Sequence, residues 1–139
     1  MQKPSPNLPC PCCSGLKYKK CCQKYHKGAK PANAEYLMRS RYSAYAFGLA
    51  DYIIKTTHPD NSDYTEEWQA WREDILLFCK GTLFSGLRVI DFTEEAHEAY
   101  VEFEASLSSG LLWERSRFLK ENDTWLYVDG IFNKMPDND

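Results

Sequence analysis

The chain has 139 residues, a formal net charge of −3, and aromatic side chains at 14% of its positions. This length suits one ordinary domain with a small extra module, and the aromatic content predicts a ring-rich core or pocket. No apolar run approaches the ~20 residues of a membrane span, and no apolar signal segment precedes the first cysteines. We therefore expect a soluble, cytoplasmic protein without a membrane span.

The charge is divided unevenly along the chain. Residues 1–30 carry seven lysines and no acidic residue, which leaves ten basic and twenty acidic side chains for the remainder. A basic segment favours an acidic partner, either a protein or a nucleic acid, although a plain solvated lysine surface would have the same composition. The acidic remainder argues against general binding to duplex DNA.

Two pairs of cysteines stand near the N-terminus. Cys10 and Cys12 form the first pair, and eight residues separate it from the adjacent Cys21 and Cys22. Four thiolates complete the closed tetrahedral shell of a structural zinc ion. We therefore predict that these four cysteines bind Zn²⁺ within a small knuckle over residues 10–25.

Two other uses of the cysteines compete with zinc binding. Six cysteines in a short chain could form disulfides or act as reactive thiols. Five of the six fall within thirteen residues, however, and are too close together to cross-link distant parts of a fold. Cys13 is the spare thiol of the cluster, and a site in which it replaces Cys12 is a minor alternative. Cys79 lies in an apolar helical pattern, so we expect it to be a small core residue.

The first half of the chain after the knuckle predicts helices. Residues 26–33 predict a linker, and residues 34–57 have the apolar spacing of a helix that Asn33 can cap. Gly48 can divide this helix in two, and Pro59 follows its end.

The second half of the chain changes from helical to strand periodicity. A second long helix is expected to start near residue 63, with Asp63 and Glu66 as a capping box, and to stop at Gly81. Beyond residue 82 the apolar period becomes 2, and the strands expected are residues 84–92, 97–107, 110–120 and 124–132. Helices followed by strands predict an α+β domain over residues 31–139, in which helices pack on a curved antiparallel sheet, after a zinc knuckle over residues 1–30.

The cysteine run resembles a known zinc motif. The segment CPCCSGLKYKKCC, from Cys10 to Cys22, is similar to the SEC-C motif, and every ligand position of that motif is filled. The SEC-C motif ends the bacterial translocase motor SecA, where it binds the acidic chaperone SecB. The resemblance therefore implies a structural zinc ion and an acidic protein partner of the SecB kind.

The rest of the chain resembles the YchJ family of bacterial proteins. The matching stretches are Leu37–Tyr45, Ala50–Tyr52, Thr57–Pro59, Glu114–Asn122, Trp125 and Tyr127–Gly130. The resemblance implies the cone-like α+β fold of nuclear transport factor 2, in which helices close over a bent sheet and leave a cavity. The family has no established enzymatic activity. Some of its members carry a second SEC-C motif at the C-terminus, and we expect this chain to have only the N-terminal one.

Several polar side chains are candidates for the wall of such a cavity. Strand alternation puts Arg115 and Arg117 on one face of their strand and Glu114 on the other, and it puts Tyr127 and Asp129 together on the next strand. We interpret an ion pair of Asp129 with Arg117 or Arg115 across these strands as a structural contact, with a ligand-binding or a catalytic pair as the alternatives. The candidate pocket residues are Arg39, Arg41, His58, Arg115, Arg117, Tyr127 and Asp129.

No catalytic residue emerges from the sequence. His58 could be a general base, but it stands at a helix end before Pro59, where a histidine is often only a capping group. His26 and His97 lie in linker-like and turn-like surroundings. Phosphate-binding loops, nucleophile elbows and HExxH motifs are missing from the sequence.

The most direct function that the sequence supports is interaction. The basic knuckle would dock on an acidic protein surface, with contacts from Lys17, Tyr18, Lys19, Lys20 and Lys24. One alternative is a small molecule bound or transformed in the cone cavity. Another is contact with RNA or the ribosome through the knuckle, which would depend steeply on salt.

Overall fold

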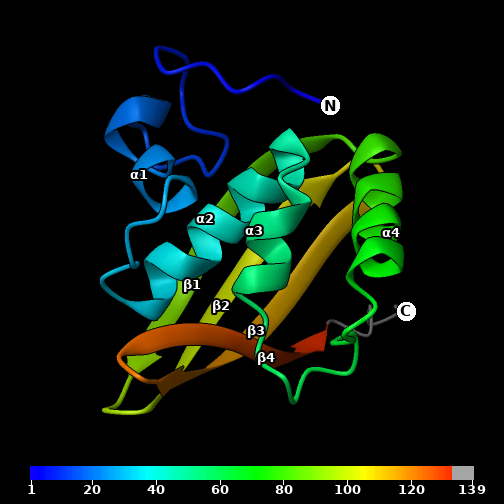
Figure 1. Cartoon of the computed structure of the whole chain (residues 1–139). Coiled ribbons are helices and arrows are strands. Elements are labelled where there is room, and N and C mark those ends of the chain that lie inside the picture. Colours follow the sequence, from blue (N-terminus) through cyan, green and yellow to red (C-terminus); the bar gives the residue numbers. More distant parts are fainter. Residues whose placement is uncertain (133–139) are drawn as a thin grey trace, which may run out of the picture.

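Helices cover one face of a four-stranded antiparallel sheet (Figure 1). The computed structural model describes residues 1–132. Its helices are α1 (Gln23–His26), α2 (Ala34–Phe47), α3 (Ala50–Lys55) and α4 (Trp68–Lys80), with a 3₁₀ turn η1 (Tyr18–Lys20) before them. Its strands are β1 (Phe84–Glu94), β2 (Glu98–Leu107), β3 (Gly110–Glu121) and β4 (Thr124–Phe132), which pair in chain order. The predicted α+β class is confirmed. Among the described residues, no helix combines the length and the apolar character needed to cross a membrane.

Helix α2 has the start and the end that the sequence predicts. The side chain of Asn33 accepts a hydrogen bond from the backbone N–H of Tyr36 at 2.9 Å, which satisfies one free donor of the first turn. Gly48 adopts a left-handed conformation with φ of 74°, which glycine enters at little cost. The helix predicted over residues 34–57 is therefore two helices, α2 and α3, divided at Gly48.

Helix α4 starts later than predicted. The capping box of Asp63 and Glu66 is wrong, because α4 begins at Trp68. The backbone N–H of Asp63 bonds the side chain of Asn61 at 2.8 Å, and the hydroxyl of Thr65 accepts the N–H of Glu67 at 3.1 Å. These local contacts hold residues 61–67 in a loop, because short polar side chains compete with helical hydrogen bonds.

The inner face of the sheet carries the core. Phe103 of β2 lies opposite Glu114 of β3, and Val101 lies opposite Ser116, all on the side of the helices. The neighbouring pair Tyr100 and Arg117 lies on the outer side. Strand alternation thus brings one acidic residue and one serine of β3 toward the helices.

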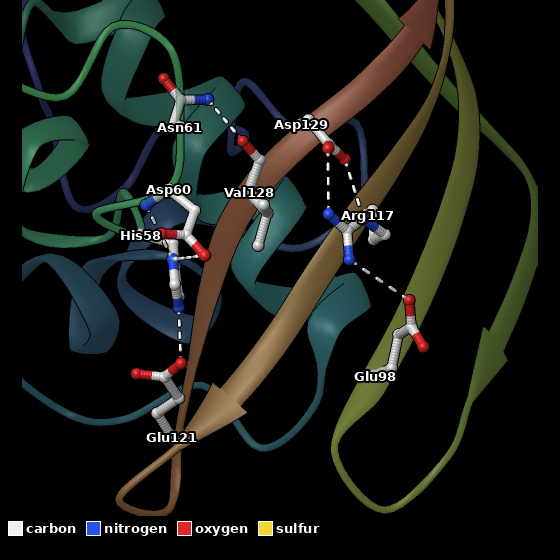
Figure 2. A network of polar contacts seen from close by, with 8 residues as sticks. All are labelled: His58, Asp60, Asn61, Glu98, Arg117, Glu121, Val128 and Asp129. Atoms are coloured by element: carbon white, nitrogen blue, oxygen red, sulfur yellow. Dashed lines mark hydrogen bonds and ion pairs between the residues drawn. The ribbon is translucent and has the colours of Figure 1, made fainter.

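An irregularity in β4 changes which side chains share a face. Asp129 lies opposite Arg117 and Tyr127 opposite Phe118, so Val128 is an extra residue between them. Tyr127 therefore faces inward while Asp129 faces outward, and the prediction that they share a face is wrong. The carbonyl of Val128 accepts a hydrogen bond from the Asn61 side chain at 2.6 Å (Figure 2).

The N-terminal knuckle packs directly against α2. Cys12, Tyr18 and Cys22 belong to the same buried cluster as Leu37 of α2. The rings of Tyr18 and Phe47 meet edge to face with centroids 4.9 Å apart. The boundary at residue 30 remains a prediction about folding units, but the parts on its two sides share one core.

Candidate metal centre and cavity

The four predicted cysteines converge on one buried point. The Sγ atoms of Cys10, Cys12, Cys21 and Cys22 all lie within 4.8 Å of one another. The pair Cys12–Cys21 is 3.5 Å apart and the pair Cys21–Cys22 is 3.9 Å apart, close to the ~3.8 Å between sulfurs around a tetrahedral zinc ion with bonds of about 2.3 Å. All four cysteines are free, and hydrogen bonds from the other three thiols hold the pKa of Cys10 far below its ordinary value. The donor set, its spacing and its burial fit a metal ion.

A tight hairpin turns Cys13 away from this point. The backbone N–H of Cys10 bonds the carbonyl of Leu16 at 2.9 Å, and the N–H of Cys13 bonds the carbonyl of Cys10 at 3.2 Å. Cys13 has a positive φ of 63° and is exposed, with its thiol 3.6 Å from the Pro11 carbonyl. Its sulfur therefore lies outside the cluster, which disfavours the arrangement in which Cys13 replaces Cys12.

Helix α2 supplies one wall of the metal centre. The hydroxyl of Ser43, which is fully buried, lies 3.4 Å from the sulfurs of both Cys10 and Cys22. Arg39 donates to the backbone carbonyl of Cys12 at 2.9 Å and pairs with Glu35 at 3.0 Å. Arg39 therefore braces the knuckle and is absent from the lining of the cavity, contrary to prediction. Such outer contacts orient ligands and tune metal affinity.

The buried side chain of Tyr18 anchors the knuckle to α1 and α2. It is 3% exposed, and its hydroxyl donates to Nδ1 of His26 at 2.6 Å, while Nε2–H of His26 donates to the carbonyl of Ser40 at 2.8 Å. Burial raises the pKa of Tyr18 to about 12 and lowers the pKa of His26, so both side chains are neutral. The structure thus removes Tyr18 from the predicted docking surface, and His26 is part of α1 instead of a linker.

The lysines of the knuckle are exposed. Lys17, Lys19, Lys20 and Lys24 all face solvent. Within residues 1–132, the ion pairs involve other basic side chains and none of the lysines of residues 1–30. Their charge is therefore free to act on a partner.

A cavity of about 390 Å³ lies between α2, α4 and the inner face of the sheet. Its walls are mainly apolar and include several aromatic rings, with contributions from Tyr42, Tyr45, Phe78, Phe84, Phe103 and Phe118. Its polar lining includes Arg41, Glu114, Ser116 and Tyr127. The α+β domain thus has a pocket with aromatic walls and a small polar centre.

Glu114 is the buried acid of this pocket. Its Oε2 atom accepts hydrogen bonds from Ser116 at 2.8 Å and from the hydroxyl of Tyr127 at 2.7 Å. Burial raises the pKa of Glu114, although these two hydrogen bonds act in the opposite direction. A Cβ atom at Gly130 would overlap the Glu114 carboxylate, so a glycine makes room for it on β4.

Arg41 is the buried cation of the same pocket. Its Nη1 atom donates to Thr56 Oγ1 at 2.7 Å, to the carbonyl of Ile53 at 3.2 Å and to Thr57 Oγ1 at 3.2 Å. Its guanidinium carbon lies 4.7 Å from the centre of the Tyr127 ring. Tyr127 thus contacts Arg41 through its ring and Glu114 through its hydroxyl.

His58 lies outside the cavity and serves a structural role. Its Nε2 is 2.6 Å from a carboxylate oxygen of Glu121, and its Nδ1 accepts the backbone N–H of Asp60 at 3.0 Å (Figure 2). Its own backbone N–H donates to the carbonyl of Tyr127 on β4 at 2.8 Å. Both ring nitrogens are occupied, so His58 ties a loop to the β3–β4 hairpin and has no free nitrogen for general base catalysis.

The predicted cross-strand ion pair forms on the outer face of the sheet. Both nitrogens of the Arg117 fork lie 3.0 Å from Asp129, and a third contact reaches Glu98 at 3.5 Å (Figure 2). Arg115 lies over the ring of Tyr100 at 4.0 Å. Arg115 and Arg117 are therefore not pocket residues. Asp129 reaches the rim of the cavity, with its carboxylate turned to Arg117.

Of the predicted pocket residues, Arg41 and Tyr127 contribute side chains to the polar centre. Alternation along β3 predicts that Glu114 and Ser116 lie on the face opposite the arginines, and Glu114 could therefore face a cavity, but the predicted pocket residues include neither of them. The signal that could have identified them is the regular spacing of Glu114 and Ser116 with Phe118, a large apolar residue that must face the core.

Known proteins share both parts of this architecture. Residues 33–130 match the family described as YchJ, middle NTF2-like domain, and residues 7–24 match the SEC-C motif. A UPF0225 protein of Pectobacterium carotovorum is 39% identical over 132 residues, which cover 88% of this chain and 82% of the relative.

Two solved structures have the same fold. A SEC-C motif containing protein from Rhodopseudomonas palustris superposes with a TM-score of 0.74 at 32% identity, over 88% of this chain and 96% of that one. A SEC-C motif containing protein from Psychrobacter arcticus superposes with a TM-score of 0.70 at 32% identity, over 86% of this chain and 80% of that one.

Proposed function

The chain belongs to the YchJ family and carries a SEC-C motif, and from this premise we propose that its knuckle binds zinc and docks on an acidic protein. The observation that carries the proposal is the charge of residues 1–30: seven exposed lysines, no acidic residue and no ion-pair partner within residues 1–132. An uncompensated basic surface accelerates encounter with an acidic one.

The role proposed for zinc is structural. Four thiolates fill a tetrahedral shell and leave no position for water or substrate. The ion would close the hairpin around Cys10 and Cys12 onto the turn that holds Cys21 and Cys22. It would therefore fix the backbone that carries the lysines without taking part in a reaction.

The fold supports a rigid presentation of these lysines. Lys19 and Lys20 lie on η1, and Lys17 precedes it directly. Tyr18, on the same turn, is buried beneath them against Phe47 and His26. A turn anchored by one buried ring directs its charged neighbours outward, so less conformational entropy is lost when they meet a partner.

The experiment compares two double variants with the same change in charge. Lys19→Glu with Lys20→Glu reverses charge on the knuckle, and Lys55→Glu with Lys80→Glu does so on exposed helix positions of the main domain. Each protein is immobilised, exposed to a lysate of its native cell with and without ribonuclease, and eluted with salt. The retained proteins are then purified and titrated against all three forms.

We expect an acidic protein to be retained by the wild type and by the Lys55/Lys80 variant, and to be lost with the Lys19/Lys20 variant. Its affinity should fall as salt rises, because exposed charges are screened over about 8 Å at physiological ionic strength. Equal retention by all three forms contradicts the proposal. Retention that ribonuclease abolishes assigns the knuckle to RNA instead.

A further inference from the structure

The cavity contains a buried cation that has no carboxylate partner within residues 1–132. Arg41 is 8% exposed, and within residues 1–132 no carboxylate oxygen lies within ion-pair distance of it. Its contacts are neutral: two threonine hydroxyls, one carbonyl and the face of Tyr127. Buried charges in proteins are usually paired, because an isolated charge is costly to remove from water.

The guanidinium of Arg41 offers one free edge. All of its protein hydrogen bonds use Nη1, which leaves Nε and Nη2 without a partner among the described residues. These two atoms are not sealed from solvent, because the one sealed and unpartnered side-chain polar atom in that part of the chain is Nε1 of Trp125. Arg41 lines the cavity, and we infer that this exposed free edge is the part of the side chain that opens into it. Nε and Nη2 together form the planar fork that matches a carboxylate.

Glu114 likewise keeps one oxygen free. Both of its hydrogen bonds, from Ser116 and Tyr127, reach Oε2. Within residues 1–132, Oε1 has no hydrogen-bond partner, and it too is not sealed. The cavity therefore presents a free cationic fork and a free carboxyl oxygen, bridged by Tyr127, among aromatic walls.

We propose that this cavity binds a small monocarboxylate with an aromatic or aliphatic body, whose carboxylate is held by the Nε–Nη2 edge of Arg41. The apolar body lies against the aromatic walls, where Tyr45, Phe84 and Phe103 contribute. The Oε1 atom of Glu114, in its protonated form, donates a second hydrogen bond to the same ligand. This site is separate from the docking surface of the knuckle.

The proton on Glu114 makes binding dependent on pH. The charged and titratable groups around it are Arg41 and Tyr45 from α2, Tyr127 and Asp129 from β4, and Asp63 from the loop before α4. An ionised Glu114 would repel a carboxylate ligand, whereas a neutral one donates to it. Affinity is therefore expected to fall as pH rises through the pKa of Glu114, which burial raises.

The experiment uses the full-length protein and matched pairs of probes. Benzoate, phenylacetate, indole-3-acetate and hexanoate are titrated by calorimetry and by ligand-observed NMR, each beside its neutral amide. We expect at least one acid to bind saturably and about tenfold or more tighter than its amide, since a bidentate charge-assisted contact is lost in the amide. Equal affinities for acid and amide, or no saturable binding by any of the four acids at millimolar concentration, overturn the proposal.

Three variants locate the site. Arg41→Gln is expected to abolish the preference for the acid, while Arg117→Gln, whose arginine lies on the outer face, is expected to keep it. Glu114→Gln is expected to bind the acid with an affinity that no longer changes between pH 6 and pH 8, a range in which all four acids are ionised. A preference that survives Arg41→Gln overturns the assignment. If Arg41→Gln fails to fold, the comparison of acid with amide on the wild type still tests whether the protein binds a carboxylate.

Discussion

The metal centre and the cavity both use helix α2, but they differ in how completely their polar atoms are satisfied. At the metal centre, Ser43 and Arg39 of α2 complete a shell around four converging sulfurs. In the cavity, Arg41 of the same helix and Glu114 of β3 each retain polar atoms without a protein partner among the described residues. A saturated site holds the fold together, whereas an unsaturated one has bonding capacity for something else.

The largest effect is expected from the loss of one metal ligand. Cys10→Ser should reduce zinc content from about one ion per chain toward zero, because a closed structural zinc site needs four thiolate or imidazole ligands and serine supplies neither. Structural zinc contributes roughly 10–16 kcal/mol to the folding of small zinc-finger peptides. Since the knuckle and α2 share one buried cluster, unfolding of the whole chain should also shift to lower temperature. Elemental analysis and calorimetry measure the two effects.

Cys13→Ser is the matched control for that variant. Its thiol is exposed and lies outside the sulfur cluster, so zinc content and thermal stability should both stay at the wild-type level. Full zinc content in Cys10→Ser, or zinc loss in Cys13→Ser, would contradict the ligand assignment. An unchanged main transition in Cys10→Ser would show that the knuckle and the domain unfold independently.

The sequence predicted the cluster of four cysteines well because the information for it is local. The spacing of four cysteines over thirteen residues specifies which sulfurs can meet, and the cap at Asn33 and the break at Gly48 depend on only a few neighbours. Tyr18 was misplaced for the opposite reason. It stands within a run of lysines, and only the position of Phe47 in space reveals that its ring faces inward.

A smaller effect is expected where α2 touches the metal centre. Ser43→Ala removes a hydroxyl that lies beside two of the sulfurs, and outer contacts of this kind typically change metal affinity by about 10–100-fold. We expect zinc affinity to fall about tenfold, measured by competition with a chelator. Ser116→Ala removes a buried hydroxyl of the cavity and should leave zinc affinity unchanged. Equal losses in the two variants would indicate general destabilisation instead of a contact to the ligands.

The cavity was harder to predict because its information is not local. Its polar centre combines α2, β3 and β4, so it depends on strand register. The extra residue Val128 alone reverses the side on which Asp129 lies relative to Tyr127. Regular alternation therefore grouped Asp129 with Tyr127 and left Glu114 without an assigned role. Neither the hydrophobic period nor the spacing of residues predicts the bulge at Val128. The carbonyl of Val128 accepts a hydrogen bond from Asn61, which lies sixty-seven residues earlier in the chain.

The smallest expected effect concerns the charge on Glu114. Burial raises its pKa above the ordinary 4.5, so the folded protein holds this proton more tightly than the unfolded chain does. The resulting stability is fully present below the ordinary pKa and is lost as pH rises through the folded pKa.

Glu114→Gln keeps an oxygen that can accept hydrogen bonds from Ser116 and Tyr127 but removes the titration. The free energy of unfolding of the variant should therefore rise relative to that of the wild type as pH increases from 5 to 8. Denaturant unfolding at the two pH values measures this change, with Glu104→Gln on the outer face as the control. A difference between Glu114→Gln and wild type that stays constant over this range would show that Glu114 is ionised in the folded protein throughout, and its free oxygen would then be a site for a cation or a neutral donor.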